Sequence, residues 1–177
     1  ASCIPTKNKN YTFNQKYCII KNGGVVMKYQ TIKYHEMSTE MLEQLRIGAF
    51  FTTKVGDKVN TMTIAWGGIN IVWNKPLFVA YVRFSRDSHE MVEKSCEFTI
   101  SVPLKKDMRK ALAYCGTKSG RDVNKIKEMN LTLAPGRVVE TPVLSDCELH
   151  YECKVIYKLP MEHGLIQQAV KERYYRH

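Results

Sequence analysis

The most regular pattern in this sequence lies late in the chain, where residues 147–157 alternate between apolar and polar. The apolar positions are Cys147, Leu149, Tyr151, Cys153, Val155 and Tyr157, and the residues between them are polar except for Ile156. A period of two indicates a β-strand with one buried face, which is typical of antiparallel sheets. We therefore expect a long, half-buried strand here and a fold organised around an antiparallel sheet.

Other segments predict further strands separated by short helices. Residues 49–54 and 59–66 form a predicted hairpin around the turn Gly56-Asp57, and more strands are expected at 76–84 and 98–103. Helices are predicted at 39–46, with Ser38 as N-cap, and at 86–95, 105–116, 124–130 and 165–175. Parallel βαβ units would need regular strand–helix alternation, which is missing. The predicted class is mainly β, an antiparallel β-barrel with peripheral helices.

Length and charge narrow the class of protein further. A chain of 177 residues without a Pro/Gly/Ser-rich linker favours one domain. No apolar run approaches the roughly 20 residues of a membrane helix, and the N-terminus has no apolar signal sequence, so a cytoplasmic location is expected. The formal net charge is +10, but residues 1–26 supply four of these charges and contain no acid. The other basic residues are scattered, which argues against a nucleic-acid partner.

The cysteines and histidines give no metal-binding pattern. The six cysteines are Cys3, Cys18, Cys96, Cys115, Cys147 and Cys153, with no CxxC pair among them, and the five histidines form no ligand set. We expect reduced thiols, mostly buried as small apolar side chains, and no metal site.

Three polar segments interrupt this apolar scaffold: NTMTIAWGG (60–68), RFSRDS (83–88) and YCGTKSGRD (114–122). Each lies where a regular element meets a loop, which is where binding groups are usually displayed. In the first, small polar residues suit a planar, hydrogen-bonding ligand, and Gly67-Gly68 would leave room for it to approach.

The second polar segment suggests an anion site. Arg83 ends a predicted strand, and Ser85 and Ser88 bracket a helix start, whose free N–H groups favour an anion. One arginine, two hydroxyls and a helix terminus would suit a phosphomonoester. The alternative is structural: Ser85 caps the helix and Arg83 is a solvated edge residue.

The three segments, in this order, resemble one family. The runs GAFFTTKVGDKVNTMTIAWGGIN, PLFVAYVRFSRDSHEMVEKSCEFTISVP and CGTKSGRDVNKI look like the flavoredoxin branch of the flavin reductase-like, FMN-binding split-barrel family, over most of residues 45–160. The resemblance implies a Greek-key split barrel that forms a homodimer, with FMN bound non-covalently near the subunit interface. It assigns no catalytic side chain, because the flavin itself carries the redox chemistry.

The resemblance also implies a set of cofactor-binding residues. Near the isoalloxazine and ribityl parts it places Asn60, Thr61, Met62, Thr63 and Trp66. Around the phosphate it places Arg83, Ser85 and Ser88, and in the loop bordering the flavin Cys115, Gly116 and Ser119, with Arg121 and Asp122 bracing that loop. For Met62, Trp66 and Cys115, packing in the core is an equally good interpretation.

Two functions from different classes follow from the resemblance. The first is an FMN-dependent oxidoreductase that passes electrons from NADH or NADPH to the flavin and on to an acceptor. The second is a flavoredoxin-type electron carrier that exchanges electrons with a protein partner without direct NAD(P)H turnover. The sequence has no dinucleotide-binding fingerprint, but this family does not need one, so its absence does not separate the two.

Both ends of the chain depart from the family pattern. Residues 1–26 have no counterpart, so they are either a leader foreign to the natural chain, which would start at Met27, or a genuine extension of the domain at 27–177. The chain stops at ERYYRH, where similar proteins continue into another strand. We therefore expect the last strand of the barrel to be missing.

Overall fold

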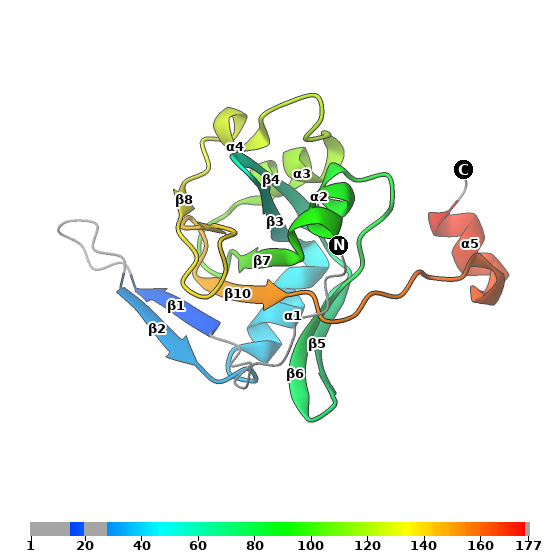
Figure 1. Ribbon diagram of the computed structural model, residues 1–177, viewed down its shortest axis with the longest axis horizontal. Helices are drawn as coiled ribbons and strands as arrows, with labels where there is room; N and C mark the ends of the chain where they lie inside the picture. Colours follow the sequence, from blue (N-terminus) through cyan, green and yellow to red (C-terminus); the bar gives the residue numbers. More distant parts are fainter. Residues whose placement is uncertain (1–14, 20–27, 176–177) are drawn as a thin grey trace.

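A six-stranded sheet with only antiparallel pairings forms the centre of the computed structural model, which describes residues 15–19 and 28–175 (Figure 1). The strands follow the order β2 (Lys28–Ile32), β1 (Gln15–Ile19), β10 (Leu149–Lys154), β7 (Glu97–Val102), β3 (Ala49–Val55) and β4 (Lys58–Ile64). Two smaller antiparallel sheets pair β5 (Gly67–Val72) with β6 (Lys75–Ala80) and β8 (Leu133–Ala134) with β9 (Val143–Leu144). The predicted mainly β class is confirmed.

Short helices lie between the strands, close to where the sequence predicts them. They are α1 (Ser38–Ile47), α2 (Asp87–Ser95), α3 (Arg109–Thr117), α4 (Lys125–Glu128) and α5 (Gln168–Tyr174), with a 3₁₀ turn at His163–Leu165. The predicted N-cap Ser38 is wrong, because Met37 occupies that position in the left-handed conformation, with φ at 63°. The Ser38 hydroxyl instead donates to the His35 carbonyl.

The hairpin of β3 and β4 confirms the predicted turn at Gly56-Asp57. Val55 pairs with Lys58, and Gly56 has φ at 56°, a left-handed angle that two-residue hairpin turns commonly require. The predicted strand 59–66 is too long, because β4 ends at Ile64. The strand β5, which begins at Gly67 and pairs with β6, was not predicted from the sequence.

Gly67 serves this β5–β6 pairing. A Cβ on Gly67 would overlap the Val79 carbonyl oxygen of β6, and the backbone of Gly67 has φ at 151°. Glycine is therefore needed so that two strands can approach each other, which is a structural reason separate from ligand access.

The core lies on both faces of the sheet. Because side chains alternate along a strand, Phe51 of β3 packs into one apolar cluster with Met41 and Ile100, whereas Phe50 packs into another with Leu112. Both phenylalanines are fully buried. The central strands therefore have little exposed surface, and polar residues on them must find partners inside the protein.

The predicted half-buried strand at residues 147–157 is wrong both in its length and in the exposure of its polar face. Strand β10 covers only Leu149–Lys154, and its polar residues His150 and Glu152 are buried like its apolar ones, whereas Lys154 at its end is exposed. Glu152 accepts hydrogen bonds from the backbone N–H groups of residues 137–139, and Glu148 accepts from those of residues 104 and 105. The loops at residues 104–105 and 137–139 cover the polar face of this strand and donate hydrogen bonds to the two carboxylates. The alternating pattern therefore does not mean that the polar side chains face solvent.

Tyr151 of β10 provides a test of this core. Its side chain is fully buried, and within the described residues its hydroxyl has no hydrogen-bond partner. Since an unsatisfied buried hydroxyl costs roughly 1–3 kcal/mol, Tyr151→Phe should leave the free energy of unfolding unchanged or raise it. Urea unfolding tests this, with Tyr114→Phe as a control that removes a hydroxyl bonded to Glu128. A loss above about 1 kcal/mol for Tyr151→Phe alone would contradict the account.

Strand β1 lies inside residues 1–26, the segment predicted to be either a foreign leader or a genuine extension of the domain. β1 pairs with β2 and with β10, so residues 15–19 belong to the main sheet. Whether residues 1–26 are native stays an open prediction, and most of them lie outside the described residues.

The thiols match the expected pattern only in part. Cys115, Cys147 and Cys153 are free and buried. Cys96 is disulfide-bonded, which corrects the expectation of reduced thiols for that residue.

The C-terminal part of the described chain forms an arm. Figure 1 shows α5 standing away from the sheet at the end of an extended segment that follows β10. Several large apolar side chains of the arm are exposed, among them Tyr157, Leu159 and Leu165. In the described ranges, no helix combines the length and the apolar character needed to cross a membrane.

Candidate functional site

A polar cleft brings the three polar segments together. It is lined by Asn60, Met62, Arg83, Ser85, Arg86, Asp87, Ser88, Thr117, Lys118, Ser119, Gly120 and Lys125. Six of the predicted cofactor-binding residues are in this set: Asn60, Met62, Arg83, Ser85, Ser88 and Ser119. The cleft measures about 120 Å³, which suits a phosphate-sized group and is smaller than pockets that enclose whole cofactors.

Residues 60–63 of β4, all predicted to bind the cofactor, alternate between the two faces of the strand. Asn60 and Met62 line the cleft, as residues two apart on a strand should. Thr61 is fully buried on the opposite face, where its hydroxyl bonds to that of Thr52 on β3 at 3.1 Å. Thr63 donates to the Leu112 carbonyl of α3 at 2.6 Å. The side chains of Thr61 and Thr63 are therefore occupied inside the protein.

β4 also has backbone hydrogen-bonding groups that its neighbour β3 does not use. β4 is the last strand in the order of the main sheet, and β3 pairs with one side of it. On such a strand, alternate residues direct their N–H and C=O groups away from the sheet. Backbone groups along residues 60–63 are therefore suited to hydrogen-bond a planar ligand.

The start of α2 forms one wall of the cleft. The N-cap is Arg86, not Ser85, and no side chain caps this helix. Ser88 is buried in the first turn, where its hydroxyl accepts from the Asn60 amide at 2.9 Å. The cleft thus lies at the N-terminus of a nine-residue helix, where free N–H groups and the helix dipole favour an anion.

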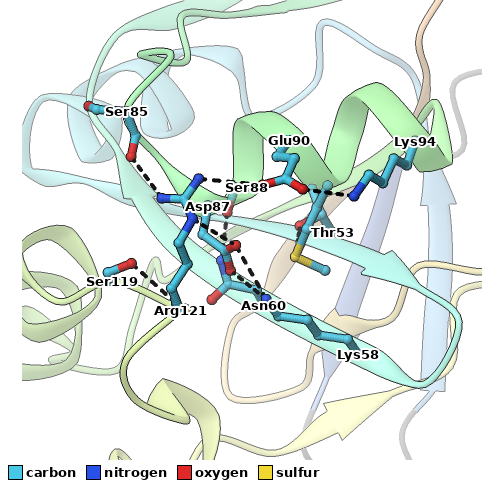
Figure 2. A network of polar contacts seen from close by, with 11 residues as sticks. Thr53, Lys58, Asn60, Ser85, Asp87, Ser88, Glu90, Lys94, Ser119 and Arg121 are labelled. Atoms are coloured by element: carbon cyan, nitrogen blue, oxygen red, sulfur yellow. Dashed lines mark hydrogen bonds and ion pairs between the residues drawn. The ribbon is translucent and has the colours of Figure 1, made fainter.

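Arg121 holds the opposite wall in place. Its guanidinium donates to the Ser85 carbonyl at 3.2 Å and lies 3.6 Å from the Glu90 carboxylate (Figure 2). Its backbone N–H donates to the Ser119 hydroxyl at 3.1 Å. Arg121 therefore connects the loop after α3 to the segment that leads into α2.

Positive charge dominates the cleft. Arg83, Arg86, Lys118 and Lys125 line it, and Asp87 is the one acid among the lining residues. The Asp87 carboxylate is buried and lies 3.0 Å from Lys58 Nζ and 3.8 Å from Arg121 Nε (Figure 2). Because these two cations balance Asp87, the four basic residues leave a net positive cleft for an anion.

Lys125 is a residue of the cleft that was not predicted from the sequence. Its side chain is only 3% exposed, although it lines the cleft, and its ammonium lies 3.5 Å from the Cys115 carbonyl oxygen. Burial lowers the pKa of Lys125 from its ordinary value. No sequence pattern predicts this burial, because Lys125 is one of several lysines in a polar segment that would be expected to face solvent.

Arg83 is shared between the cleft and the C-terminal arm. Its guanidinium lies 5.3 Å from the Trp66 ring centre and 5.6 Å from that of Tyr175, and it donates to the Tyr174 carbonyl at 3.1 Å. Trp66 in turn meets Tyr174 edge-on at 5.5 Å. Trp66 is 39% exposed and does not line the cleft, so its described contacts are to α5 and Arg83 rather than to the core.

Cys115 and Gly116 lie behind the cleft. Cys115 is fully buried in the apolar cluster with Phe50 and Leu112, which favours its interpretation as a core residue. Gly116 packs against Thr63, where a Cβ would lie 3.4 Å from Thr63 Cβ. α3 continues to Thr117, so Gly116 does not end the helix as predicted.

The Cys115 thiol should be unreactive in the native protein. Burial raises its pKa to about 11, so less than roughly one thiol in a thousand is ionised at pH 7.5. We expect iodoacetamide to label Cys115 only after unfolding, as peptide mapping by mass spectrometry would show. Labelling of Cys115 in native protein within minutes, with Cys147 and Cys153 still protected, would instead place this thiol at an open site.

Comparisons with known proteins give the family and the fold that the chain resembles. The flavin reductase-like domain matches residues 48–177. An uncharacterized protein of Archaeoglobus fulgidus is 32% identical over 103 residues, which cover 56% of this chain and 55% of that protein. The match therefore spans about half the length of this curated relative.

Solved structures resemble the chain in fold. A flavoredoxin from Methanosarcina acetivorans superposes with a TM-score of 0.57 and 25% identity, over 64% of this chain and 59% of that one. An FMN-binding domain of a flavin reductase-like enzyme from Shewanella baltica gives a TM-score of 0.58 with 16% identity, over 93% of this chain and 73% of that one. The fold predicted from the resemblance is therefore confirmed.

Proposed function

Because the chain belongs to the flavin reductase-like domain family, we propose that it binds FMN non-covalently and acts as an FMN-dependent oxidoreductase reduced by NADH or NADPH. The observation that carries the proposal is the polar cleft, where three segments distant in sequence place basic and hydroxyl groups around a phosphate-sized space.

The residues of the cleft fit the phosphate end of FMN. A phosphomonoester is a dianion near neutral pH, and the cleft offers four basic side chains, the Ser85 and Ser119 hydroxyls, and the N-terminus of α2. The adjacent edge of β4 offers backbone groups for the polar edge of a flavin ring. This combination supports a nucleotide cofactor that is anionic at one end and planar at the other.

FMN bound here would supply the electron-accepting ring, and the protein would position it. Backbone N–H groups along residues 61–63 are suited to stabilise negative charge on the pyrimidine edge of the ring. Arg83, Ser85 and the start of α2 would anchor the phosphate and so fix the direction of the ring.

We propose that the functional unit is a homodimer with FMN near the interface. The cleft of about 120 Å³ accommodates the phosphate end, so a second surface must cover the ring. The exposed apolar side chains of the C-terminal arm, including Leu159 and Leu165, offer such a surface on a second copy. The oligomeric state and the cytoplasmic location stay predictions.

One experiment separates reductase from carrier. We would load the purified protein with FMN and mix it anaerobically with NADH or NADPH while recording the visible spectrum. Bleaching of the flavin absorbance within seconds is the expected result. Bound FMN that stays oxidised with both donors, yet is reduced by a protein partner, would instead favour a flavoredoxin-type carrier, the description of two structural neighbours.

A further inference from the structure

Lys125 is a charged residue that the fold buries beneath the polar cleft. It starts the short helix α4, and its side chain is only 3% exposed while still lining the cleft. Lysine is almost never this buried without a partner, because an ammonium removed from water loses its favourable hydration. Its retention at this position therefore requires a compensating interaction.

The neighbours of Lys125 offer little compensation. The Cys115 carbonyl oxygen lies at 3.5 Å, which is long for a hydrogen bond from an ammonium. Asp87 is the one acid of the cleft, and it already faces Lys58 and Arg121. Arg86 and Lys58 add positive charge near Lys125, and burial lowers its pKa. The surroundings of Lys125 therefore favour an additional anion in the cleft.

We propose that Lys125 makes this cleft select a phosphorylated flavin over an unphosphorylated one, by pairing its ammonium with the phosphate. This inference rests on the proposed function, and it adds the residue that determines which flavin is accepted. Among the four basic residues that line the cleft, Lys125 is buried, whereas Arg83 and Lys118 are exposed. A buried charge is screened least by salt and water, so it contributes most to discrimination between charged and neutral ligands.

The test compares Lys125→Met with the wild-type chain. Methionine keeps the unbranched apolar stem and removes the charge. Lys127→Met, on the exposed side of the same helix α4, is the matched control. Fluorescence titrations with FMN and with riboflavin give the two affinities, and thermal unfolding with and without inorganic phosphate reports on the anion alone.

The expected result is a loss of discrimination. Lys125→Met should lower the FMN affinity roughly 10- to 100-fold, leave the riboflavin affinity unchanged, and lose the stabilisation by inorganic phosphate. Without ligand, its unfolding temperature should equal or exceed that of the wild type, because a buried unpaired charge has been removed. Lys127→Met should match the wild type in all measurements.

Each other outcome is decisive. If Lys125→Met weakens FMN and riboflavin equally and also unfolds earlier, Lys125 has a structural role and the inference fails. If it binds FMN as tightly as the wild type, the inference fails while the proposed function stands. If the wild type binds neither flavin, the proposed function fails, and the phosphate measurement alone then decides whether Lys125 binds an anion.

Discussion

Replacing Gly120 with alanine should destabilise the fold by at least about 2 kcal/mol and remove measurable FMN binding. A Cβ on Gly120 would overlap the Asn60 side-chain amide and lie 2.6 Å from the Asp87 carboxylate. Both side chains are buried and fixed, Asn60 by its bond to Ser88 and Asp87 by Lys58. Neither can move without leaving a buried polar group unpaired, so the cleft should distort.

Urea unfolding and FMN titration measure the two effects of Gly120→Ala. Gly164→Ala is the control, because a Cβ there meets no atom within 4 Å. That variant should unfold within about 0.5 kcal/mol of the wild type and bind FMN normally. If Gly120→Ala were as stable as Gly164→Ala and kept its FMN affinity, the close packing of Gly120 against Asn60 would not define the cleft.

Replacing Arg83 with alanine should lower the FMN affinity roughly 10- to 100-fold, because a charge-assisted contact to the phosphate is lost. The same change should release α5, since Arg83 joins Trp66 and the Tyr174 carbonyl. Fluorescence titration measures the affinity, and limited proteolysis between residues 155 and 175 measures the release.

Two matched variants control for Arg83→Ala. Arg83→Lys keeps the charge but loses the planar guanidinium, so it should bind FMN with intermediate affinity. Arg46→Ala removes an exposed arginine of α1 that does not line the cleft, and it should behave as the wild type. Unchanged FMN affinity in Arg83→Ala would refute the phosphate role of Arg83, even if α5 became sensitive to protease.

Secondary structure was predicted correctly where a single local sequence pattern, such as a turn motif between two β-rich runs, determines it. The hairpin around Gly56-Asp57 follows from a turn motif between two β-rich runs, and the structure has it in the expected register. The strand β5 was missed because Gly67 and Gly68 have low β-propensity, and only their pairing with β6 explains them. Likewise, Glu152 reads as a surface residue until the loop at 137–139 is folded over it.

The candidate site likewise combines residues that a local pattern predicts with residues that only tertiary packing brings into place. The polar segments around Asn60, Arg83 and Ser119 were recognisable, because hydroxyls and a basic residue at element ends are unusual in an apolar scaffold. Their convergence on one cleft came only from the fold. Lys125 could not be recognised from sequence, since burial of a lysine depends on tertiary packing and leaves no local pattern.

Titration of the wild-type chain with FMN, followed by flavin fluorescence and visible absorbance, measures whether the polar cleft binds a flavin. We expect saturable binding of one FMN per chain with a Kd of ~10 µM or tighter, weakened by added salt or inorganic phosphate. No change in either signal at FMN concentrations of ~100 µM would contradict the central claim that the polar cleft holds the phosphate of a flavin.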